Sequence, residues 1–108
     1  MSTTLAALAL VALSGPASPA WAQHGGDAAT GATLARTWCS TCHVVGPGQA
    51  DGTSTGAPPF AAIAHMKSTT PTALRVFLQT PHGRMPDLHL SRQEIADVSA
   101  YIMSLRKP

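Results

Sequence analysis

Cys39-Ser40-Thr41-Cys42-His43 is the stretch of this 108-residue sequence that decides its fold, since it places both cysteines of the chain beside a histidine. Two cysteines three positions apart near the end of a helix bring their sulfur atoms to one side of the chain. C-x-x-C-H is the signature of covalent haem attachment, in which the thiols form thioethers with two vinyl groups and the histidine ligates the iron. The motif predicts one haem c with its iron, held by Cys39, Cys42 and the proximal ligand His43.

Three other interpretations of the same motif remain open. A thioredoxin-like dithiol would lie near a βαβ pattern, and the sequence contains no convincing strand. A zinc site would require two more well-spaced Cys or His ligands, and no second C-x-x-C exists. A plain structural disulfide is the third. Haem attachment is favoured over all three.

Composition limits the class of protein. Hydrophobic residues make up 44 % of the chain and charged residues 11 %, with nine glycines and nine prolines, which is an ordinary globular balance with many turns. Seven basic against five acidic residues is too mild an excess to suggest nucleic-acid binding. The length allows one domain at most.

The first 22 residues have the pattern of a targeting segment. Leu5–Leu13 is an unbroken apolar run, Ser14-Gly15-Pro16 would break a helix, and Ala20-Trp21-Ala22 is a small-residue cleavage signal. The run is too short for a bilayer span, which takes about 20 residues. We therefore predict a signal peptide at 1–22, a domain at 23–108, a periplasmic location and no membrane insertion after cleavage. The alternative is an uncleaved anchor or a buried helix, and residues 1–4 contain no Lys or Arg.

A domain of residues 23–108 is small enough to need added stability. Such a chain buries little core, and two cysteines cannot supply a disulfide framework. A bound cofactor at the centre would resolve this.

The sixth iron ligand is predicted to be Met85. It lies in Pro81-His82-Gly83-Arg84-Met85-Pro86-Asp87, where two prolines and a glycine prevent a helix and stiffen the loop. Met66 and Met103 lie in helical patterns and are interpreted as core residues. Three histidines are alternative distal ligands: His65, His82 and His89. His24 is expected to face solvent.

Four helical segments can be predicted. They begin at about Asp27, at Pro58-Pro59, at Thr70-Pro71 and at Ser91, where Glu94 completes a capping box. Their apolar positions recur at helical spacing. The expected inward residues are Gly31, Leu34, Ala35, Trp38, Leu74, Phe77, Leu78, Ile95, Val98, Ile102 and Leu105, with Tyr101 beside the last group.

With this motif, a Met-Pro loop and an amphipathic carboxyl-terminal helix, the chain resembles the small soluble class I cytochrome c family over nearly all of residues 23–108. The resemblance implies an all-α fold of about four helices around one covalently bound haem. It implies a close crossing of Gly31 against Tyr101, although the aromatic that often precedes the first cysteine by four positions is Ala35 here. It also implies that the Pro58 carbonyl accepts a hydrogen bond from His43, with Pro47 as an outside alternative, and that Met85 ligates the iron.

The function expected from this resemblance is single-electron transfer by a monohaem carrier, not an enzyme. We expect a monomer that docks briefly on redox partner proteins and binds no nucleic acid. Two alternatives stay open. One is a ligand-binding, sensor or peroxidase-like haem protein with a labile sixth site, and the other is a cytochrome subunit of an exported dehydrogenase or oxidase complex.

Overall fold

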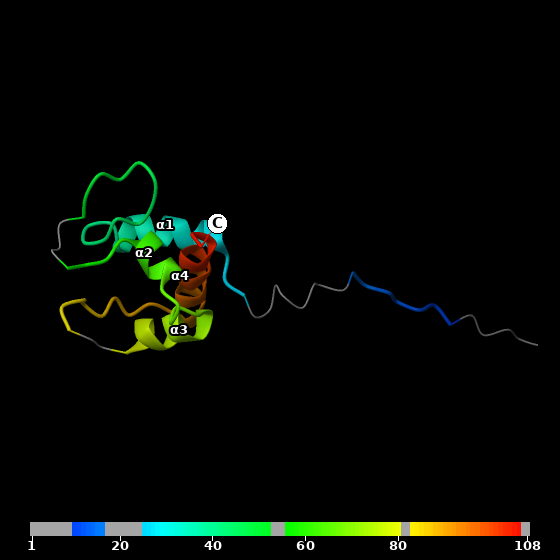
Figure 1. Ribbon diagram of the computed structural model, residues 1–108. Coiled ribbons are helices and arrows are strands. Elements are labelled where there is room, and N and C mark those ends of the chain that lie inside the picture. Colours follow the sequence, from blue (N-terminus) through cyan, green and yellow to red (C-terminus); the bar gives the residue numbers. More distant parts are fainter. Residues whose placement is uncertain (1–9, 17–24, 53–55, 81–82, 107–108) are drawn as a thin grey trace, which may run out of the picture.

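Four helices make up the regular structure of the protein (Figure 1). The computed structural model describes residues 10–16, 25–52, 56–80 and 83–106, and no β-strand occurs in these ranges. The helices are α1 (Ala28–Trp38), α2 (Phe60–His65), α3 (Pro71–Gln79) and α4 (Arg92–Ser104). The prediction of a small all-α fold with about four helices is confirmed.

The predicted signal peptide, residues 1–22, lies largely outside the described residues. In its described part, residues 10–16, the backbone is not helical and the side chains are exposed. This segment runs away from the helices (Figure 1). Within the described ranges, no helix has both the length and the apolar character needed to cross a membrane.

The helices begin where capping side chains satisfy their first amide groups. The Asp27 carboxylate accepts from the amides of Ala29 and Thr30 at the start of α1, and these hydrogen bonds, with one from the Thr30 hydroxyl, lower the pKa of Asp27. At α4 the Ser91 hydroxyl accepts from the Glu94 amide, and the Glu94 carboxylate accepts from the Ser91 amide at 2.7 Å. The predicted capping box is confirmed.

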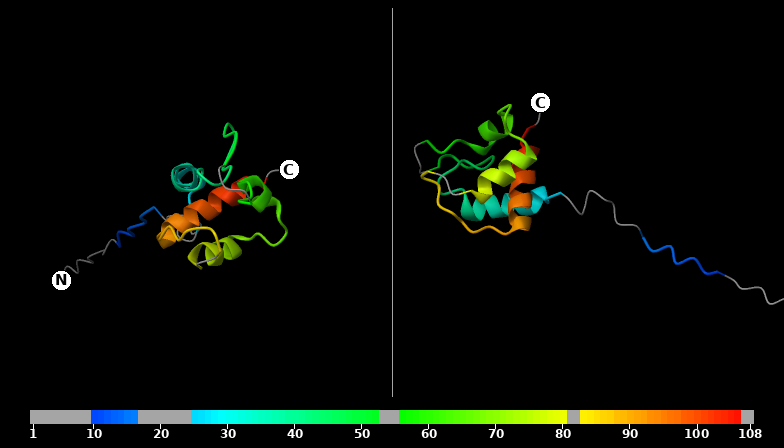
Figure 2. Two further views of the ribbon diagram at one scale, coloured as in Figure 1. Left: turned by 90° about the vertical axis from the view of Figure 1, so that its left-hand side faces the viewer. Right: turned by 90° about the horizontal axis from the view of Figure 1, so that it is seen from below.

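Helix α4 is the centre of the arrangement. It packs against α1, α2 and α3, whereas those three helices make no comparable contacts with one another. Figures 1 and 2 show α1 and α3 on different sides of α4. Its buried side chains Ile95, Val98 and Ile102 form the inner face of the core. Because all three helices pack on α4, this helix also fixes where the segments between them lie.

The tightest contact in the fold is the crossing of α1 over α4. A Cβ atom added at Gly31 would lie 1.9 Å from the Asp97 carbonyl oxygen and 2.9 Å from Tyr101 Cβ, so only glycine fits. The buried Asp97 carboxylate strengthens this crossing, because it accepts from the amide of Asp27, the N-cap of α1, at 2.7 Å. It also accepts from the Gln93 side chain of its own helix at 2.9 Å. The crossing of Gly31 against Tyr101 that the resemblance implied is present.

Two residues predicted to face inward are half exposed. Trp38 is 56 % and Phe77 is 50 % exposed. Trp38 is the last residue of α1, two turns beyond Gly31, and the crossing does not reach it. Phe77 shares the face of α3 that carries buried Leu74, but α4 covers this face only in part. The predicted helices are confirmed, but the prediction that these two side chains are buried is wrong.

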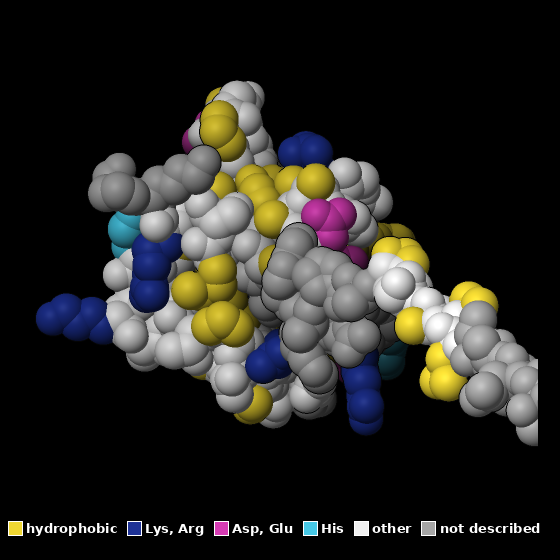
Figure 3. All heavy atoms as spheres, turned by 90° about the vertical axis from the view of Figure 1, so that its right-hand side faces the viewer, with side chains coloured by type: hydrophobic (Ala, Val, Ile, Leu, Met, Phe, Trp, Pro, Cys, Tyr) yellow, Lys and Arg dark blue, Asp and Glu magenta, His cyan; other side chains and the backbone are white. Residues whose placement is uncertain are grey.

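Basic side chains do not gather in one patch on the face shown in Figure 3, where they are dispersed among apolar and polar groups. One basic residue of the domain has a structural role. Arg106 lies beyond the end of α4 and donates to the carbonyl oxygens of Ala64, Met66 and Thr69 at 2.8, 2.9 and 3.2 Å. Arg106 therefore ties the end of the domain to the segment between α2 and α3.

Candidate haem-binding site

The C-x-x-C-H motif continues the last turn of α1. The Cys39 amide donates to the Ala35 carbonyl at 2.9 Å, and the amides of Cys42 and His43 donate to the Cys39 carbonyl at 3.2 and 2.9 Å. This turn holds Cys42 and His43 close to Cys39. Cys39 is buried, Cys42 is half-buried, and both are free thiols.

The environment of Cys39 disfavours the thiolate. Burial, and to a smaller extent the charge of Cys42, raises the pKa of Cys39 to about 11. Thiol–disulfide exchange requires a thiolate, and redox-active C-x-x-C pairs have a lowered pKa instead. The environment of Cys39 therefore differs from that of the attacking cysteine in a redox-active dithiol.

The zinc interpretation also lacks a ligand set in the part of the chain that the structure describes. In residues 10–16, 25–52, 56–80 and 83–106, no three His, Cys, Asp or Glu side chains come together to hold a metal ion. A structural zinc ion takes four ligands.

The ring of His43 is fixed by the Pro58 carbonyl. His43 Nδ1 lies 2.7 Å from Pro58 O. A carbonyl oxygen only accepts, so Nδ1 carries a proton, and in the neutral imidazole Nε2 is then the nitrogen with the lone pair. The Phe60 ring packs beside the imidazole with centroids 5.3 Å apart. The structure thus places Pro58, and not Pro47, at this position.

Pro58 is presented to His43 by long-range contacts. The Phe60 amide donates to the Val44 carbonyl at 2.9 Å, which pairs the segment before α2 with the chain just after the motif. Phe60 is buried and packs against the Tyr101 ring at 6.4 Å. The Tyr101 hydroxyl in turn donates to the Val45 carbonyl at 2.6 Å. Tyr101 of α4 therefore supports both Phe60, which packs beside the imidazole, and the backbone that follows His43.

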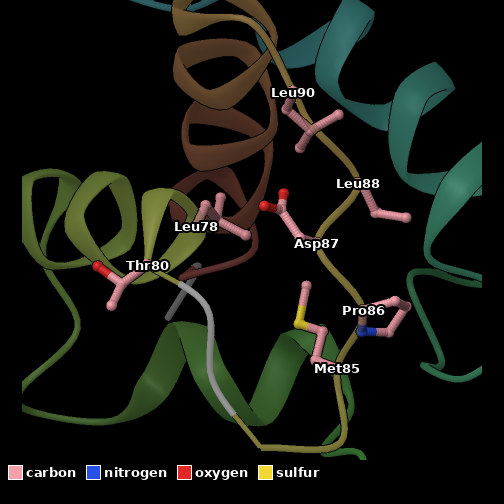
Figure 4. Close-up of a pocket in the computed structure, with 7 residues that line it drawn as sticks. All are labelled: Leu78, Thr80, Met85, Pro86, Asp87, Leu88 and Leu90. Atoms are coloured by element: carbon pink, nitrogen blue, oxygen red, sulfur yellow. The ribbon is translucent and has the colours of Figure 1, made fainter.

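Met85 lies in a second region, the segment that connects α3 with α4 (Figure 4). It is half-buried and its side chain extends into a small hollow beside Leu78. The hollow has apolar walls with two polar members, and its lining residues are Leu78, Thr80, Met85, Pro86, Asp87, Leu88 and Leu90. The motif residues do not line this hollow.

The other candidate ligands have different surroundings. His65 Nδ1 bonds the Ala61 carbonyl of its own helix at 2.7 Å, and His89 lies beside Asp87 with Nδ1 and Oδ2 3.6 Å apart. His24 and His82 lie outside the described residues. Met103 packs on the core as predicted. The core interpretation of Met66 is wrong, because this residue at the end of α2 is 52 % exposed.

Gln49 is a residue of the site that the sequence pattern did not indicate. The side-chain amide of Gln49 bonds four backbone groups of the motif and the loop that follows it. It stands in a Gly- and Pro-rich loop without periodicity, and no local pattern distinguishes it from a solvated polar residue.

The residues present fit a covalently held haem. The site offers two free thiols at C-x-x-C spacing and an imidazole whose Nδ1 bonds the Pro58 carbonyl, which leaves Nε2 as the nitrogen that can ligate a metal. Half-exposed Phe77 adds apolar surface on α3, beside the helix end that lines the Met85 hollow. A flat apolar macrocycle bound by thioethers and an axial histidine requires these features.

Comparison with known proteins agrees with this geometry. The family described as "Cytochrome C oxidase, cbb3-type, subunit III" matches residues 26–102. Cytochrome c-552 of Bradyrhizobium diazoefficiens is 48 % identical over 80 residues, which cover 74 % of this chain and 76 % of the relative. No solved structure matches the chain significantly.

Proposed function

This chain belongs to the cytochrome c family, so that its cofactor is haem c and its function is electron transfer, and we propose that it works as a free carrier between periplasmic redox proteins. In this proposal the protein is a monomer and catalyses no reaction on a substrate. Its donor and acceptor proteins dock briefly over a small interface, as is typical of electron-transfer encounters.

The proposed attachment site is the motif itself. Cys39 and Cys42 hold the haem by thioethers, and His43 Nε2 is the proximal iron ligand. The observation that carries this proposal is the 2.7 Å contact between His43 Nδ1 and Pro58 O. It fixes the tautomer that leaves Nε2 for a metal, and a carbonyl partner of this kind also raises the basicity of the ligating nitrogen.

Met85 is the proposed distal ligand. Its support is the small hollow between α3 and the 85–90 segment, whose lining includes Met85 and the apolar side chains Leu78, Leu88 and Leu90 (Figure 4). Pro86 stiffens the backbone next to it. His89 is a weaker candidate because its side chain is 87 % exposed and lies beside Asp87.

These residues set the conditions for electron transfer. When bound, haem supplies an iron that accepts and releases one electron. His43, oriented by Pro58, would supply a nitrogen lone pair to the iron, and a methionine sulfur as second ligand would favour the reduced state and raise the potential. Phe60, Leu74 and Val98 belong to the buried apolar core. Apolar surroundings would disfavour the added charge of the oxidised state and raise the potential further.

Export is part of the proposal. The apolar run Leu5–Leu13 and the Ala20-Trp21-Ala22 sequence support a signal peptide at residues 1–22, cleaved to leave a domain at 23–108. Sizing the protein from the periplasmic fraction by intact mass would test this. A mass that includes residues 1–22 would contradict cleavage.

A second candidate is a cytochrome subunit of an exported oxidase complex. The name of the matched family, which describes an oxidase subunit, favours it. Purification of the tagged chain without detergent separates the two. Recovery as a monomer supports the free carrier, and recovery of a stoichiometric larger protein supports the subunit.

The main test is an absorption spectrum of the exported full chain, made in cells able to attach haem and recorded in both redox states. We expect a c-type spectrum whose colour survives denaturation, with the weak red band of methionine-sulfur ligation in the ferric form. Met85→Ala should lose this band and allow the ferrous protein to bind carbon monoxide. Met66→Ala is the matched control and should keep the band.

Two outcomes would contradict the proposal. A colourless protein would contradict covalent haem attachment at Cys39 and Cys42. A wild-type spectrum without the red band, with rapid carbon monoxide binding, would remove Met85 as ligand and favour a ligand-binding, sensor or peroxidase-like haem protein.

A further inference from the structure

We propose that Gln49 is a positioning residue for His43, which clamps the backbone around the proximal histidine and so fixes the orientation of its ring. The inference rests on the proposed function, since it takes His43 as the iron ligand. Gln49 lies six positions after His43 in the sequence. Its hydrogen bonds go to backbone groups and not to the imidazole.

The side-chain amide of Gln49 uses nearly all its hydrogen-bonding capacity on backbone groups. Its Oε1 accepts from the Val45 amide at 2.9 Å, and its Nε2 donates to the carbonyl oxygens of Ser40 and His43, both at 2.7 Å. A third acceptor, Asp51 O, lies at 3.3 Å. An amide NH₂ has two hydrogens, so the two short bonds account for both.

These bonds surround His43 along the chain. Ser40 precedes it, Val45 follows it, and the third bond goes to the carbonyl of His43 itself. One side chain therefore fixes the relative positions of residues 40, 43 and 45. A helix would do this with its own backbone bonds, but α1 ends at Trp38, and residues 39–45 form turns and irregular backbone.

Two further contacts anchor the clamped segment to the rest of the fold. The Tyr101 hydroxyl donates to the Val45 carbonyl at 2.6 Å, and Val45 is 2 % exposed. The Pro58 carbonyl accepts from the His43 ring. With the backbone held by Gln49 and Tyr101 and the ring held by Pro58, the imidazole has no freedom to rotate without breaking a bond. Outer hydrogen bonds of this kind orient a ligand and tune the metal.

The chemistry of the site requires glutamine. A glutamate would keep the bond from the Val45 amide, but it cannot donate to the Ser40 and His43 carbonyls and would place negative charge against them. A methionine of similar length would make none of the bonds. An ordinary solvated loop residue would tolerate both changes.

Arg106 provides a matched control. Its guanidinium also bonds three backbone carbonyls, those of Ala64, Met66 and Thr69. None of these belongs to the motif or to the loop that follows it. Loss of Arg106 should therefore lower stability without affecting the orientation of His43.

The experiment compares wild type, Gln49→Met, Gln49→Glu and Arg106→Met as exported, haem-loaded full chains. For each, the midpoint of thermal unfolding, the reduction potential and the proton NMR spectrum of the ferric form are measured. The spread of the shifted haem methyl signals follows the orientation of the axial ligands. We expect both Gln49 variants to change this spread and the potential, and Arg106→Met to lower the unfolding midpoint while leaving both unchanged.

The outcomes separate the inference from the proposed function. Unchanged methyl shifts and potential in a Gln49 variant, with an unfolding midpoint lowered as in Arg106→Met, would show a merely structural role and overturn the inference. If Gln49→Met does not accumulate, Gln49→Glu decides by the same readouts, because it keeps the Val45 bond. A wild-type protein without covalent haem would overturn the proposed function before any variant is compared.

Discussion

The two regions that carry the candidate iron ligands are built in different ways. On the proximal side, His43 is held by partners far away in the sequence: Pro58 bonds its ring, and Tyr101 of α4 bonds the neighbouring Val45. On the distal side, the segment 83–90 has local devices, namely Pro86 and a turn in which the His89 amide donates to the Asp87 carboxylate at 2.8 Å.

This difference predicts how each region responds to change. Contacts between residues distant in the sequence form only when the whole domain folds. A substitution that removes such a contact on the proximal side should therefore lower the free energy of unfolding of the domain. A locally stiffened loop can change its ligand without disturbing the helices.

Replacing Gly31 by valine should destabilise the whole domain. A side chain at this position would overlap the Asp97 backbone, and forced overpacking of a core contact costs about 3 kcal/mol. Urea unfolding of the haem-loaded protein measures the change. Thr33→Val, an isosteric change at an exposed position of the same helix, is the control and should stay within about 0.5 kcal/mol of wild type. Equal stability of the two variants would contradict the close crossing.

Tyr101→Phe should cost about 2 kcal/mol of unfolding free energy, because it leaves the buried Val45 carbonyl without its hydrogen bond. The phenyl ring would still pack against Phe60. The red band of methionine ligation should persist in this variant, since the distal segment is untouched. A loss of the band with no loss of stability would reverse the contrast between the two regions.

Phe77→Ala should destabilise the haem-loaded protein by about 1.5 kcal/mol, which is the low end of the range for burying a large apolar side chain. Phe77 follows Leu74 and precedes Leu78 on one face of α3, the face next to the Met85 hollow, and we expect the haem to cover it. Val76 is 58 % exposed and lies on another face. Val76→Ala should therefore stay within about 0.5 kcal/mol of wild type, and a matching loss in both variants would show that haem does not cover Phe77.

His89→Gly should have the smallest effect, a gain of about 0.5 kcal/mol. His89 has a φ of 51°, a left-handed conformation that costs a residue with a Cβ about 1 to 2 kcal/mol. Glycine removes this strain but adds freedom to the unfolded chain, which offsets part of the gain. The same urea titration measures it. A net loss of stability would mean that the contacts of the His89 side chain stabilise the protein by more than its left-handed backbone conformation costs.

Much of the fold could be read from local sequence. Ser91 and Glu94 predict the start of α4, and Thr70 and Pro71 predict the start of α3. Both helices begin at these residues in the structure. The reason is that a capping hydrogen bond spans only three residues, so the pattern contains the whole interaction. The motif likewise names its chemistry within five residues.

The cover of each helix could not be read in this way. Trp38 and Leu74 both occupy apolar positions at helical spacing, yet Trp38 is half exposed and Leu74 is buried. Periodicity identifies a face, but which part of that face is covered depends on where another helix crosses it.

The sequence by itself determined the four helices, the cysteine pair with its histidine, and the family to which they belong. Only the tertiary structure decided that Pro58 meets the His43 ring, that Gln49 bonds the backbone on both sides of it, and that Tyr101 anchors the segment. The first set rests on interactions between residues a few positions apart. The second rests on residues up to 56 positions apart, such as Tyr101 and Val45, which meet only when α4 has packed against α1.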